Sequence, residues 1–296
     1  MHIAILATSE RSWYADDLNR AATALGHCTS VVPFSNLTAE VCSGHSSVWG
    51  GGGELSAVDA VVVRTMPPGS LEQVVFRMNL LAQLEARGVV VFNPPRAVEC
   101  AVDKYLTTAR LIAAGLPTPE TIVCENSEAG LEAFSRLGGD VVVKPIFGSE
   151  GRGIVRVSDP DLALRTFRTL ERIDAVLYLQ KFIPHEGFDL RVMVLDGRIL
   201  GGMRRRNPLD FRTNVARRAT VEPVELTPEQ CDWAVRAAAA VGARLAGVDL
   251  LYDCGAGYVI EVNGVPGWKA FNRAAGCDMA TEVIRTLAAG PPSPRH

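Results

Sequence analysis

The stretch GVDLLYDCGAGYVIEVNGVPGW, residues 247–268, decides the fold of this chain. Two runs that are rich in β-branched and apolar residues, 248–253 and 258–263, flank a turn at 254–257 that carries glycine. Runs of this length on either side of such a turn predict a β-hairpin. Gly-Val-Pro-Gly at 264–267 then ends the second strand.

Three oxygen-bearing side chains interrupt these apolar strands: Asp249, Glu261 and Asn263. Glu261 and Asn263 are two residues apart, so they point to the same face of their strand. If the hairpin loop has an odd number of residues, Asp249 lies on that face too, opposite one of them. Two carboxylates and an amide oxygen suit Mg²⁺, which retains several water ligands and coordinates substrate phosphates at its remaining positions. A hairpin with a solvated polar face is the alternative interpretation.

The composition is that of a globular protein, with 296 residues of which 48% are hydrophobic and 21% charged. This length allows two or three domains with a substantial core. The formal net charge of -3 argues against binding nucleic acid through bulk charge. There is no run of about 18 or more uncharged apolar residues, so no membrane-spanning helix is expected. The first residues lack the pattern of a signal peptide, and we expect a cytoplasmic protein.

Cysteine and histidine spacing argues against a disulfide framework and against a zinc site. The seven cysteines are scattered and never form a CxxC pair, and the five histidines show no HxxxH spacing. Scattered cysteines in odd number are typical of reduced intracellular thiols. Zinc chemistry is therefore not expected.

The first third of the chain alternates strands and helices. Strands are predicted at residues 3–7, 30–34, 57–64 and 89–92, and helices at residues 13–25 and 70–87. This alternation predicts a small domain with a parallel sheet, of the α/β class. The glycine run at 50–53 precedes a strand and joins no strand to a helix. It is interpreted as a flexible loop and not as a dinucleotide fingerprint.

The rest of the chain mixes helices and antiparallel strands, which is the α+β pattern. Further strands are predicted at residues 120–124, 140–145, 153–157, 176–182, 188–195 and 198–204. Helices are predicted at residues 97–114, 127–137, 161–172, 228–245 and 279–289. Asp196-Gly197 is a strong signal for a type I′ hairpin turn.

Residues 141–157, VVVKPIFGSEGRGIVRV, read as two apolar strands joined by a glycine-rich loop. Glycines let backbone N–H groups approach a phosphate closely, and Lys144 can reach over the loop as a point charge. The loop leads into a strand, and no GK[ST] opens a helix, so it is not a Walker A loop. A plain glycine-rich hairpin is the alternative.

Two weaker signals also fit a nucleotide site. Lys104 lies in an otherwise apolar helical pattern and is a second candidate for a phosphate or base contact, although a lone lysine on a helix is usually solvated. The strand at residues 178–183 stops at Pro184, where pairing ends. Free backbone groups at such a strand end can hold an adenine edge. An ordinary edge strand is the alternative.

The most basic segment of this acidic chain lies at residues 204–218. Besides Asn214, it contains Arg204, Arg205, Arg206, Arg212, Arg217 and Arg218. Guanidinium groups bind carboxylate and phosphate through two parallel hydrogen bonds, so the segment predicts a surface for an anionic substrate. A solvated basic face is the alternative, and for Arg205 and Arg217 nothing in the sequence argues against it.

In combination, these motifs resemble the ATP-grasp fold and, more closely, its RimK-like family of α-L-glutamate ligases. The motifs follow the order of that family: Lys104, VVVKP with GSEGRG, YLQKFI, FDLRV, FRTN, and AGVDLL with IEVNGVPGW. The resemblance covers residues 97–271, and residues 1–95 are similar to the small α/β pre-ATP-grasp domain of the family. It implies three parts: residues 1–96, 97–182 and 183–296.

The resemblance implies that ATP lies between two antiparallel β layers. Its phosphates and adenine are then contacted by Lys104 and Lys144, its ribose by Asp189, and its γ-phosphate by Arg212 and Asn214. The implied lid contains Gly148, Ser149, Gly151, Arg152 and Gly153. The implied adenine hinge contains Gln180, Lys181, Phe182 and Ile183, with Gln180 where family members often have Glu. Two Mg²⁺ or Mn²⁺ ions are implied at Asp249, Glu261 and Asn263.

The activity that the resemblance implies is that of an ATP-dependent carboxylate–amine ligase. A substrate carboxylate attacks the γ-phosphate, and the amine of L-glutamate then attacks the acyl phosphate and expels phosphate. Such chemistry needs positioning and charge neutralisation more than a side-chain nucleophile. The charge that develops would be offset by Arg212, with Arg191 or Arg204. The rivals are a kinase that phosphorylates a hydroxyl and a nucleotide-binding regulator without turnover.

The carboxylate acceptor is less determined. Family members commonly have glycines where this chain has Arg217-Arg218-Ala219. The ending VNGVPGWKAF at 262–271 is more similar to ligases that add glutamate to a tetrahydromethanopterin-type cofactor than to members that modify a ribosomal protein. A small-molecule acceptor is therefore expected, and a protein C-terminus is the alternative. Homo-oligomers are usual in the resembled family.

Overall fold

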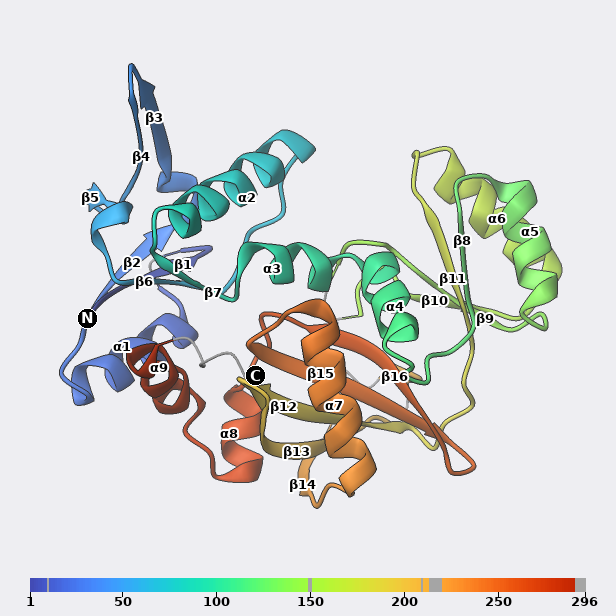
Figure 1. Ribbon diagram of the computed structural model, residues 1–296. Helices are drawn as coiled ribbons and strands as arrows, with labels where there is room; N and C mark the ends of the chain where they lie inside the picture. The colour runs from blue at the N-terminus through green and yellow to red at the C-terminus, as the bar shows by residue number, and fades with distance from the viewer. Residues whose placement is uncertain (10, 149–150, 209, 213–219, 291–296) are drawn as a thin grey trace.

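The computed structural model describes residues 1–9, 11–148, 151–208, 210–212 and 220–290. Its regions are built on a parallel sheet near the N-terminus, a four-stranded antiparallel sheet and a five-stranded antiparallel sheet (Figure 1). Among the described residues, each sheet lies within one of the parts that we propose at residues 1–96, 97–182 and 183–296. Within the described part of the chain, none of the helices has the length and apolar character needed to cross a membrane.

The first region confirms the predicted parallel sheet. Its strand order is β2-β1-β6-β7, with β1 at His2–Ala7, β2 at Cys28–Pro33, β6 at Ala60–Val63 and β7 at Val90–Phe92. Helix α1 spans Trp13–Ala24, and α2 spans Leu71–Ala86. Ser70 and Gln73 form a capping box that fixes the start of α2.

The segment between β2 and β6 folds differently from its prediction. It forms a small antiparallel sheet of β3 (Thr38–Cys42), β4 (His45–Gly50) and β5 (Gly53–Glu54), flanked by the short 3₁₀ helices η1 (Phe34–Asn36) and η2 (Leu55–Ala57). The prediction of a flexible loop at 50–53 is wrong, because Gly50 pairs with Gly53 across a tight turn. Gly51 and Gly52 both have positive φ there, which glycine adopts at little cost.

The single helix predicted at 97–114 is two helices, α3 (Pro95–Val102) and α4 (Lys104–Ala113). Asp103 between them is extended, with φ of -92° and ψ of 105°, and its carboxylate accepts a hydrogen bond from Leu106 N. Aspartate is a preferred N-cap residue, so it starts a new helix here. Lys104 is consequently the first residue of α4 and not an internal helix position.

The second region is the four-stranded antiparallel sheet, in the order β10-β9-β11-β8. Its strands are β8 (Thr121–Cys124), β9 (Val141–Lys144), β10 (Val155–Val157) and β11 (Leu177–Lys181). Helices α5 (Ser127–Arg136) and α6 (Pro160–Glu171) cover one face of this sheet (Figure 1). Phe134, Phe167 and Leu179 lie in the apolar core between them.

The third region is the five-stranded antiparallel sheet, in the order β14-β13-β12-β15-β16. Its strands are β12 (Phe188–Leu195), β13 (Arg198–Arg206), β14 (Thr220–Val224), β15 (Leu245–Asp253) and β16 (Ala256–Asn263). Asp196 and Gly197 both have positive φ, as the predicted type I′ turn requires. Helix α7 (Pro228–Val241) stops at the left-handed Gly242, so its predicted extension to 245 is wrong.

The β15–β16 hairpin forms, but the expected odd loop does not. Asp253 pairs with Ala256 across a two-residue turn of Cys254 and Gly255. A two-residue turn alone would place Asp249 opposite residue 260. A β-bulge between Asp249 and Leu250 shifts the register, so Asp249 pairs with Glu261. The bulge therefore sets the side-chain parity that the sequence analysis assigned to the loop.

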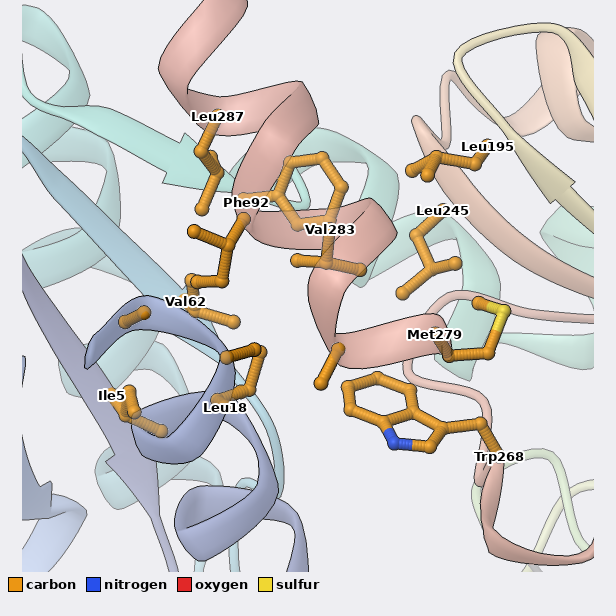
Figure 2. Close-up of a cluster of buried hydrophobic side chains, with 14 of the residues drawn as sticks. Ile5, Leu18, Val62, Phe92, Leu195, Leu245, Trp268, Met279, Val283 and Leu287 are labelled. Carbon is orange, nitrogen blue, oxygen red and sulfur yellow. The ribbon is translucent and has the colours of Figure 1, made fainter. Parts of the chain in front are cut away.

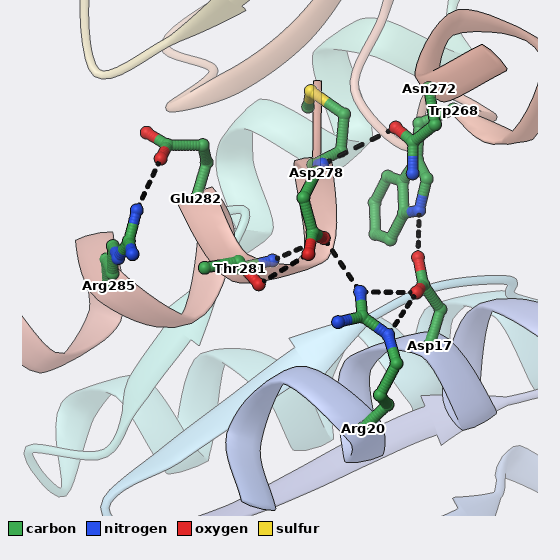
Figure 3. A network of polar contacts seen from close by, with 9 residues as sticks. Asp17, Arg20, Trp268, Asn272, Asp278, Thr281, Glu282 and Arg285 are labelled. Carbon is green, nitrogen blue, oxygen red and sulfur yellow. Dashed lines mark hydrogen bonds and ion pairs between the residues drawn. The ribbon is translucent and has the colours of Figure 1, made fainter. Parts of the chain in front are cut away.

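The core beside the parallel sheet is shared between segments distant in sequence. Helices α8 (Lys269–Ala275) and α9 (Met279–Ala289) return to the N-terminal region, where α9 packs beside α1. Figure 2 shows Leu18 and Val62 in one cluster with Trp268 and Val283. In Figure 3, Arg20 of α1 pairs with Asp17 and with Asp278, the N-cap residue of α9.

The side chain of Asn93, just after β7, ties the first region to the third. Its amide nitrogen donates to the carbonyls of Leu245 and Gly264, and its oxygen accepts from Arg244 N and Leu245 N. Asn93 is 2% exposed. These bonds hold the start of β15 and the segment after β16 against the parallel sheet.

We expect Asn93→Ala to lower the free energy of unfolding by about 2–4 kcal/mol, because several buried backbone groups lose their partner. Urea denaturation followed by circular dichroism measures the change. Asn36→Ala, at an exposed position, is the matched control and should stay within about 0.5 kcal/mol of the original chain. Equal stabilities of the two variants would contradict the role given to Asn93.

Candidate active site

A cleft of about 830 Å³ is lined by residues of the four-stranded and the five-stranded sheets. The predicted site residues that line it are Lys104, Lys144, Gly148, Gly151, Arg152, Gln180, Lys181, Phe182, Ile183, Asp189, Arg212, Asp249 and Glu261. Gly153, Arg191, Arg204 and Asn263 are not among its lining residues. Ser149 and Asn214 lie outside the described residues. The structure thus gathers most of the predicted site around one cleft.

Lys104 and Lys144 reach this cleft from different elements. Lys104, at the start of α4, donates from Nζ to Gly148 O at 2.9 Å and from its backbone N to Ile146 O at 3.3 Å. These bonds attach the first part of the glycine-rich loop to α4. Lys144, at the end of β9, donates from Nζ to Gln180 Oε1 at 2.6 Å.

Gln180 orients Lys144. Its side chain is buried, and its Nε2 donates to Thr121 Oγ1 at 3.0 Å and to Tyr178 Oη at 3.2 Å. The amide therefore has protein partners on both ends, while Gln180 still lines the cleft and its adenine contact stays a prediction. Two backbone N–H groups expected to be free are also occupied, because Lys181 N donates to Glu120 O and Phe182 N to Asp140 O.

Burial lowers the pKa of both lysines. The pKa of Lys144 falls to about 8, since desolvation outweighs the opposing attraction of Glu261 and Asp249. Desolvation also lowers the pKa of Lys104, again against the attraction of Glu261. Lys144 therefore changes its charge close to neutral pH, whereas an exposed lysine stays protonated there.

The opposite wall of the cleft holds a buried network of ion pairs. Arg191 forms two hydrogen bonds with Asp249, both at 2.6 Å. Arg205 pairs with Asp189 and also reaches Asp249 Oδ2 at 2.9 Å. The interpretation of Arg205 as a solvated basic residue is wrong, because it is 1% exposed. Asp189 of β12 and Asp249 of β15 both pair with the Arg205 guanidinium. Two carboxylates can stay ionised in the protein interior only with such a positive partner.

The predicted metal ligands are brought together by the β15–β16 register. Asp249 pairs with Glu261, and Asn263 with Gly247. Asn263 Nδ2 donates to Gly247 O at 3.2 Å and lies 3.5 Å from Asp249 Oδ2, so its Oδ1 is left as an acceptor. Burial raises the pKa of Asp249, but Arg191 and Arg205 outweigh it and the net pKa is lowered. Asp249 is therefore an anion at neutral pH.

This donor set fits Mg²⁺. Mg²⁺ takes one or two carboxylates and completes its coordination with phosphate and water, which matches two carboxylates and an amide oxygen. No cluster of three or more His, Cys, Asp and Glu side chains suited to a metal occurs among the residues that the structure describes. A protein cage for zinc is accordingly absent from that part of the chain.

The arginines predicted to offset charge are not equivalent. Arg212 lines the cleft, pairs with Asp210 at 2.7 Å and donates to Ile154 O at 3.4 Å. Arg204 instead pairs with Glu222 of β14 at 3.0 Å and stacks near Phe188. Because side chains alternate along a strand, Arg204 and the cleft-lining Arg205 point to opposite faces of β13.

Two groups that the sequence analysis did not select as site residues, Phe211 and His185, complete one end of the cleft together with Phe182. Phe211 meets Phe182 edge to face, with ring centroids 6.1 Å apart, and Arg156 lies 3.5 Å above the Phe182 ring. His185 also lines the cleft, and burial lowers its pKa. Phe211 is the first residue of the FRTN motif and His185 comes two residues after YLQKFI, which is the signal that the sequence offers for them. Flat apolar rings beside backbone groups suit a purine base.

Comparison with known proteins identifies the family to which this chain belongs. Residues 101–287 match the RimK-like ATP-grasp domain, and residues 1–98 match the RimK PreATP-grasp domain. The tetrahydromethanopterin:alpha-L-glutamate ligase of Methanosarcina acetivorans is 34% identical over 79% of this chain and 81% of its own length. A probable alpha-L-glutamate ligase of Chromohalobacter salexigens is 28% identical over 100% of this chain and 97% of its own length.

The solved structure of the ATP-grasp ligase PsnB has the same fold, with a TM-score of 0.76 and 24% identity over 97% of this chain and 98% of that chain. The fold is thus that of the ATP-grasp class. More closely, the chain belongs to the RimK-like ATP-grasp family and is an ATP-dependent ligase. ATP and Mg²⁺ are the cofactors typical of this family.

We expect Arg205→Met to lower the free energy of unfolding by about 3–5 kcal/mol, since Asp189 would stay buried without its positive partner. Thermal or urea unfolding measures the loss. Arg206→Met removes the neighbouring, exposed guanidinium and is the control, with an expected change within about 0.5 kcal/mol. A loss below about 1 kcal/mol in Arg205→Met would show that the network is not required.

The pKa of Lys144 predicts a pH-dependent nucleotide affinity. The protonated amine attracts phosphate, so raising the pH from 7 to 9 through the pKa of about 8 should weaken MgATP binding about tenfold. Gln180→Glu would place a carboxylate beside Lys144, raise its pKa and move this decline to higher pH. Fluorescence titration with a labelled ATP analogue measures both curves.

The control for this titration is Gln73→Glu, which adds the same charge in the capping box of α2. It should leave the pH curve unchanged. A Gln180→Glu curve that declines at the same pH as the original chain would exclude Lys144 as the titrating group.

Proposed function

We propose that this chain is an α-L-glutamate ligase that uses ATP to join L-glutamate to the carboxylate of a small-molecule acceptor of the pterin-cofactor type. The observation that carries the proposal is the cleft in which Lys104 and Lys144 face the Asp249–Glu261 pair. Cations on one wall and metal-binding oxygens on the other suit a metal-bound triphosphate. The 34% identity to a tetrahydromethanopterin:alpha-L-glutamate ligase supports the choice of amine and acceptor.

Nucleotide binding is assigned to the walls of the cleft. Lys104 and Lys144 would hold the phosphates, and the glycine-rich loop with Gly148, Gly151, Arg152 and Gly153 would cover them. The base would lie against Phe182 and Phe211, beside the hinge at Lys181 and Ile183. Ser149 and Asn214 keep their sequence-based assignments. Asp189, which pairs with Arg205, would approach the ribose from the cleft surface.

Asp249, Glu261 and Asn263 would hold Mg²⁺ or Mn²⁺, and we propose two ions. Bound there, the metal would neutralise phosphate charge and hold the β- and γ-phosphates in position. Arg191 and Arg205 keep Asp249 ionised and fix the direction of its carboxylate. The two arginines would thus hold the Asp249 carboxylate ionised and oriented before the nucleotide binds.

The reaction follows from charge. The acceptor carboxylate attacks the γ-phosphorus, the bond to the β–γ bridging oxygen breaks, and ADP and an acyl phosphate result. The amine of L-glutamate then attacks the acyl carbon, loses a proton and expels inorganic phosphate, which leaves an amide. Arg212 lies at the cleft and would balance the equatorial charge of the transferring phosphoryl group. Arg191 would act indirectly, through Asp249, and Arg204 is assigned to the opposite face of β13.

The purified protein with MgATP and L-glutamate should release ADP only when a suitable carboxylate acceptor is present. A panel of pterin cofactors and acidic peptides, analysed by mass spectrometry, would identify the acceptor by the gain of one or more glutamyl masses. A glutamyl mass on a peptide C-terminus would replace the small-molecule acceptor in this proposal. A phosphate mass on a hydroxyl would overturn the ligase in favour of a kinase.

Glu261→Gln is the negative control for the panel, because it removes one metal-binding carboxylate and keeps the side-chain shape. We expect ADP release to fall at least about a thousandfold while circular dichroism and the unfolding midpoint stay unchanged. Glu99→Gln, on α3 and away from the lining of the cleft, should retain normal turnover. Near-normal turnover of Glu261→Gln would remove Glu261 from the metal site.

A further inference from the structure

Arg64, directly after β6, is a buried cation at the border between the first and third regions. It is 3% exposed, and its Nη2 donates to Pro266 O at 3.0 Å. Its guanidinium lies 3.9 Å from the Trp268 ring centroid and 4.7 Å from that of Tyr14. The two rings are neighbours, with centroids 5.3 Å apart and planes at 85°, so both contact the same side region of the guanidinium and leave its nitrogens Nε and Nη1 for other partners.

This edge has no anionic partner among the described residues. Arg64 Nε is buried without a hydrogen bond. Nη1 makes no hydrogen bond either and is not among the buried unpartnered atoms, so it reaches the protein surface. Asp17 attracts Arg64 only through space, because its carboxylate accepts from Trp268 Nε1 and pairs with Arg20. A guanidinium buried without a carboxylate is costly unless something else satisfies it.

The position of Arg64 in the sheet is one where ligands bind. In the order β2-β1-β6-β7, the chain leaves β1 toward β2 on one side and later returns at β6 on the other. Ligands of open parallel sheets bind outside the carboxyl ends of strands at such a switch point. Arg64 follows the carboxyl end of β6, and Thr8 Oγ1, after β1, donates to Thr65 O across the same gap at 3.4 Å.

This switch point adjoins the candidate active site through the segment 264–268. The segment follows the metal-ligand candidate Asn263 directly and contains Pro266 and Trp268, both of which contact Arg64. A Cβ on Gly267 would lie 2.7 Å from Tyr14 Oη, so a larger residue there would displace the Tyr14 side chain. A ligand held by Arg64 is therefore next to the end of the strand that carries Glu261.

A second cation contacts the next aromatic ring along from those that Arg64 contacts. Lys269 begins α8, is exposed, and has its Nζ 5.2 Å from the ring centroid of Trp13. Trp13 in turn meets Tyr14 edge to face, with centroids 5.1 Å apart. Arg64 and Lys269 thus flank one row of aromatic rings, and no ion pair joins either of them to an acid within the described ranges.

We propose that Arg64, assisted by Lys269, binds a non-reacting carboxylate of a substrate and so selects dicarboxylate or amino-acid substrates. The inference rests on the proposed function, in which both the incoming amino acid and the acceptor carry carboxylates. ATP phosphates are already assigned to the cleft lysines, which leaves this separate cation for the carboxylate. The guanidinium edge matches a carboxylate group in shape and charge. The site would belong to L-glutamate or to the acceptor.

Calorimetric titration with L-glutamate, in the presence of Mg²⁺ and a non-hydrolysable ATP analogue, tests this site. Arg64→Met should weaken L-glutamate binding about 30-fold, Arg64→Lys less, and the exposed Lys269→Met about threefold. Arg96→Met is the matched control, since its guanidinium is exposed and pairs with Glu99, and it should bind as the original chain does. L-Glutamine and the α-amide of glutamate each remove one carboxylate from the ligand.

If Arg64 binds one carboxylate of L-glutamate, the amide that lacks this carboxylate should bind the original chain as weakly as L-glutamate binds Arg64→Met. The affinity for this amide should not fall further in Arg64→Met. This non-additivity would show which carboxylate meets Arg64. If L-glutamate binding is unchanged but the KM of the acceptor rises in Arg64→Met, the carboxylate belongs to the acceptor. If both are unchanged while the unfolding temperature falls, Arg64 is only structural and the proposal is overturned.

Failure of the proposed function gives a different result. A chain that binds the ATP analogue but glutamylates no acceptor would refute the ligase assignment while the titrations with L-glutamate still report on Arg64. Conversely, normal glutamylation by Arg64→Met with an unchanged KM for each substrate would refute the carboxylate site and leave the ligase standing. If Arg64→Met does not fold, Lys269→Met carries the same comparison from the surface.

Discussion

The burial of Asp249 and Asp189 around one guanidinium is the interaction on which the rest of the site depends. Carboxylates at the centre of a five-stranded sheet would be protonated or expelled without a cation, and Arg205 supplies it from β13. Arg191 adds a second cation from β12. The charges are neutralised internally, so the wall of the cleft keeps an ionised oxygen ligand that is held in one direction. The fixed orientation of the ionised carboxylate, more than the number of acidic residues, makes this wall of the cleft suitable for a metal-bound nucleotide.

Much of the fold could be predicted because it depends on local patterns. Alternation of apolar runs with amphipathic helices identified β1, β6 and α2, and the Asp196-Gly197 turn was apparent from two residues. Breaks that depend on one capping side chain were missed, as at Asp103 between α3 and α4. The strands of residues 38–54 were missed because short, polar and glycine-bearing runs resemble loops. The bulge near Asp249 has no signature of its own, since register is fixed by pairing with β12 and β16.

The residues of the candidate site also differ in how far the sequence predicts them. Lys144 was found from its place before the glycine-rich loop, and Glu261 from its two-residue spacing to Asn263 along one strand, and both line the cleft. Arg205 was misjudged because sequence cannot say which of two successive arginines points inward, and only strand pairing decides this. Gln180 was expected to contact adenine, and no pattern in the sequence indicated that its amide also accepts a hydrogen bond from Lys144. Arg64 gave no signal, because its importance arises from segments far apart in the chain.

Helix α9 has a consequence for how the protein is made. It covers the same core as α1 and the parallel sheet, although it is the last of the described helices in the sequence (Figure 2). While the ribosome is still adding residues, the strands near the N-terminus are complete but one of their apolar faces has no cover. The first region therefore cannot reach its final packing until α9 has been synthesised. Until then the nascent chain exposes an apolar surface of the kind that chaperones bind.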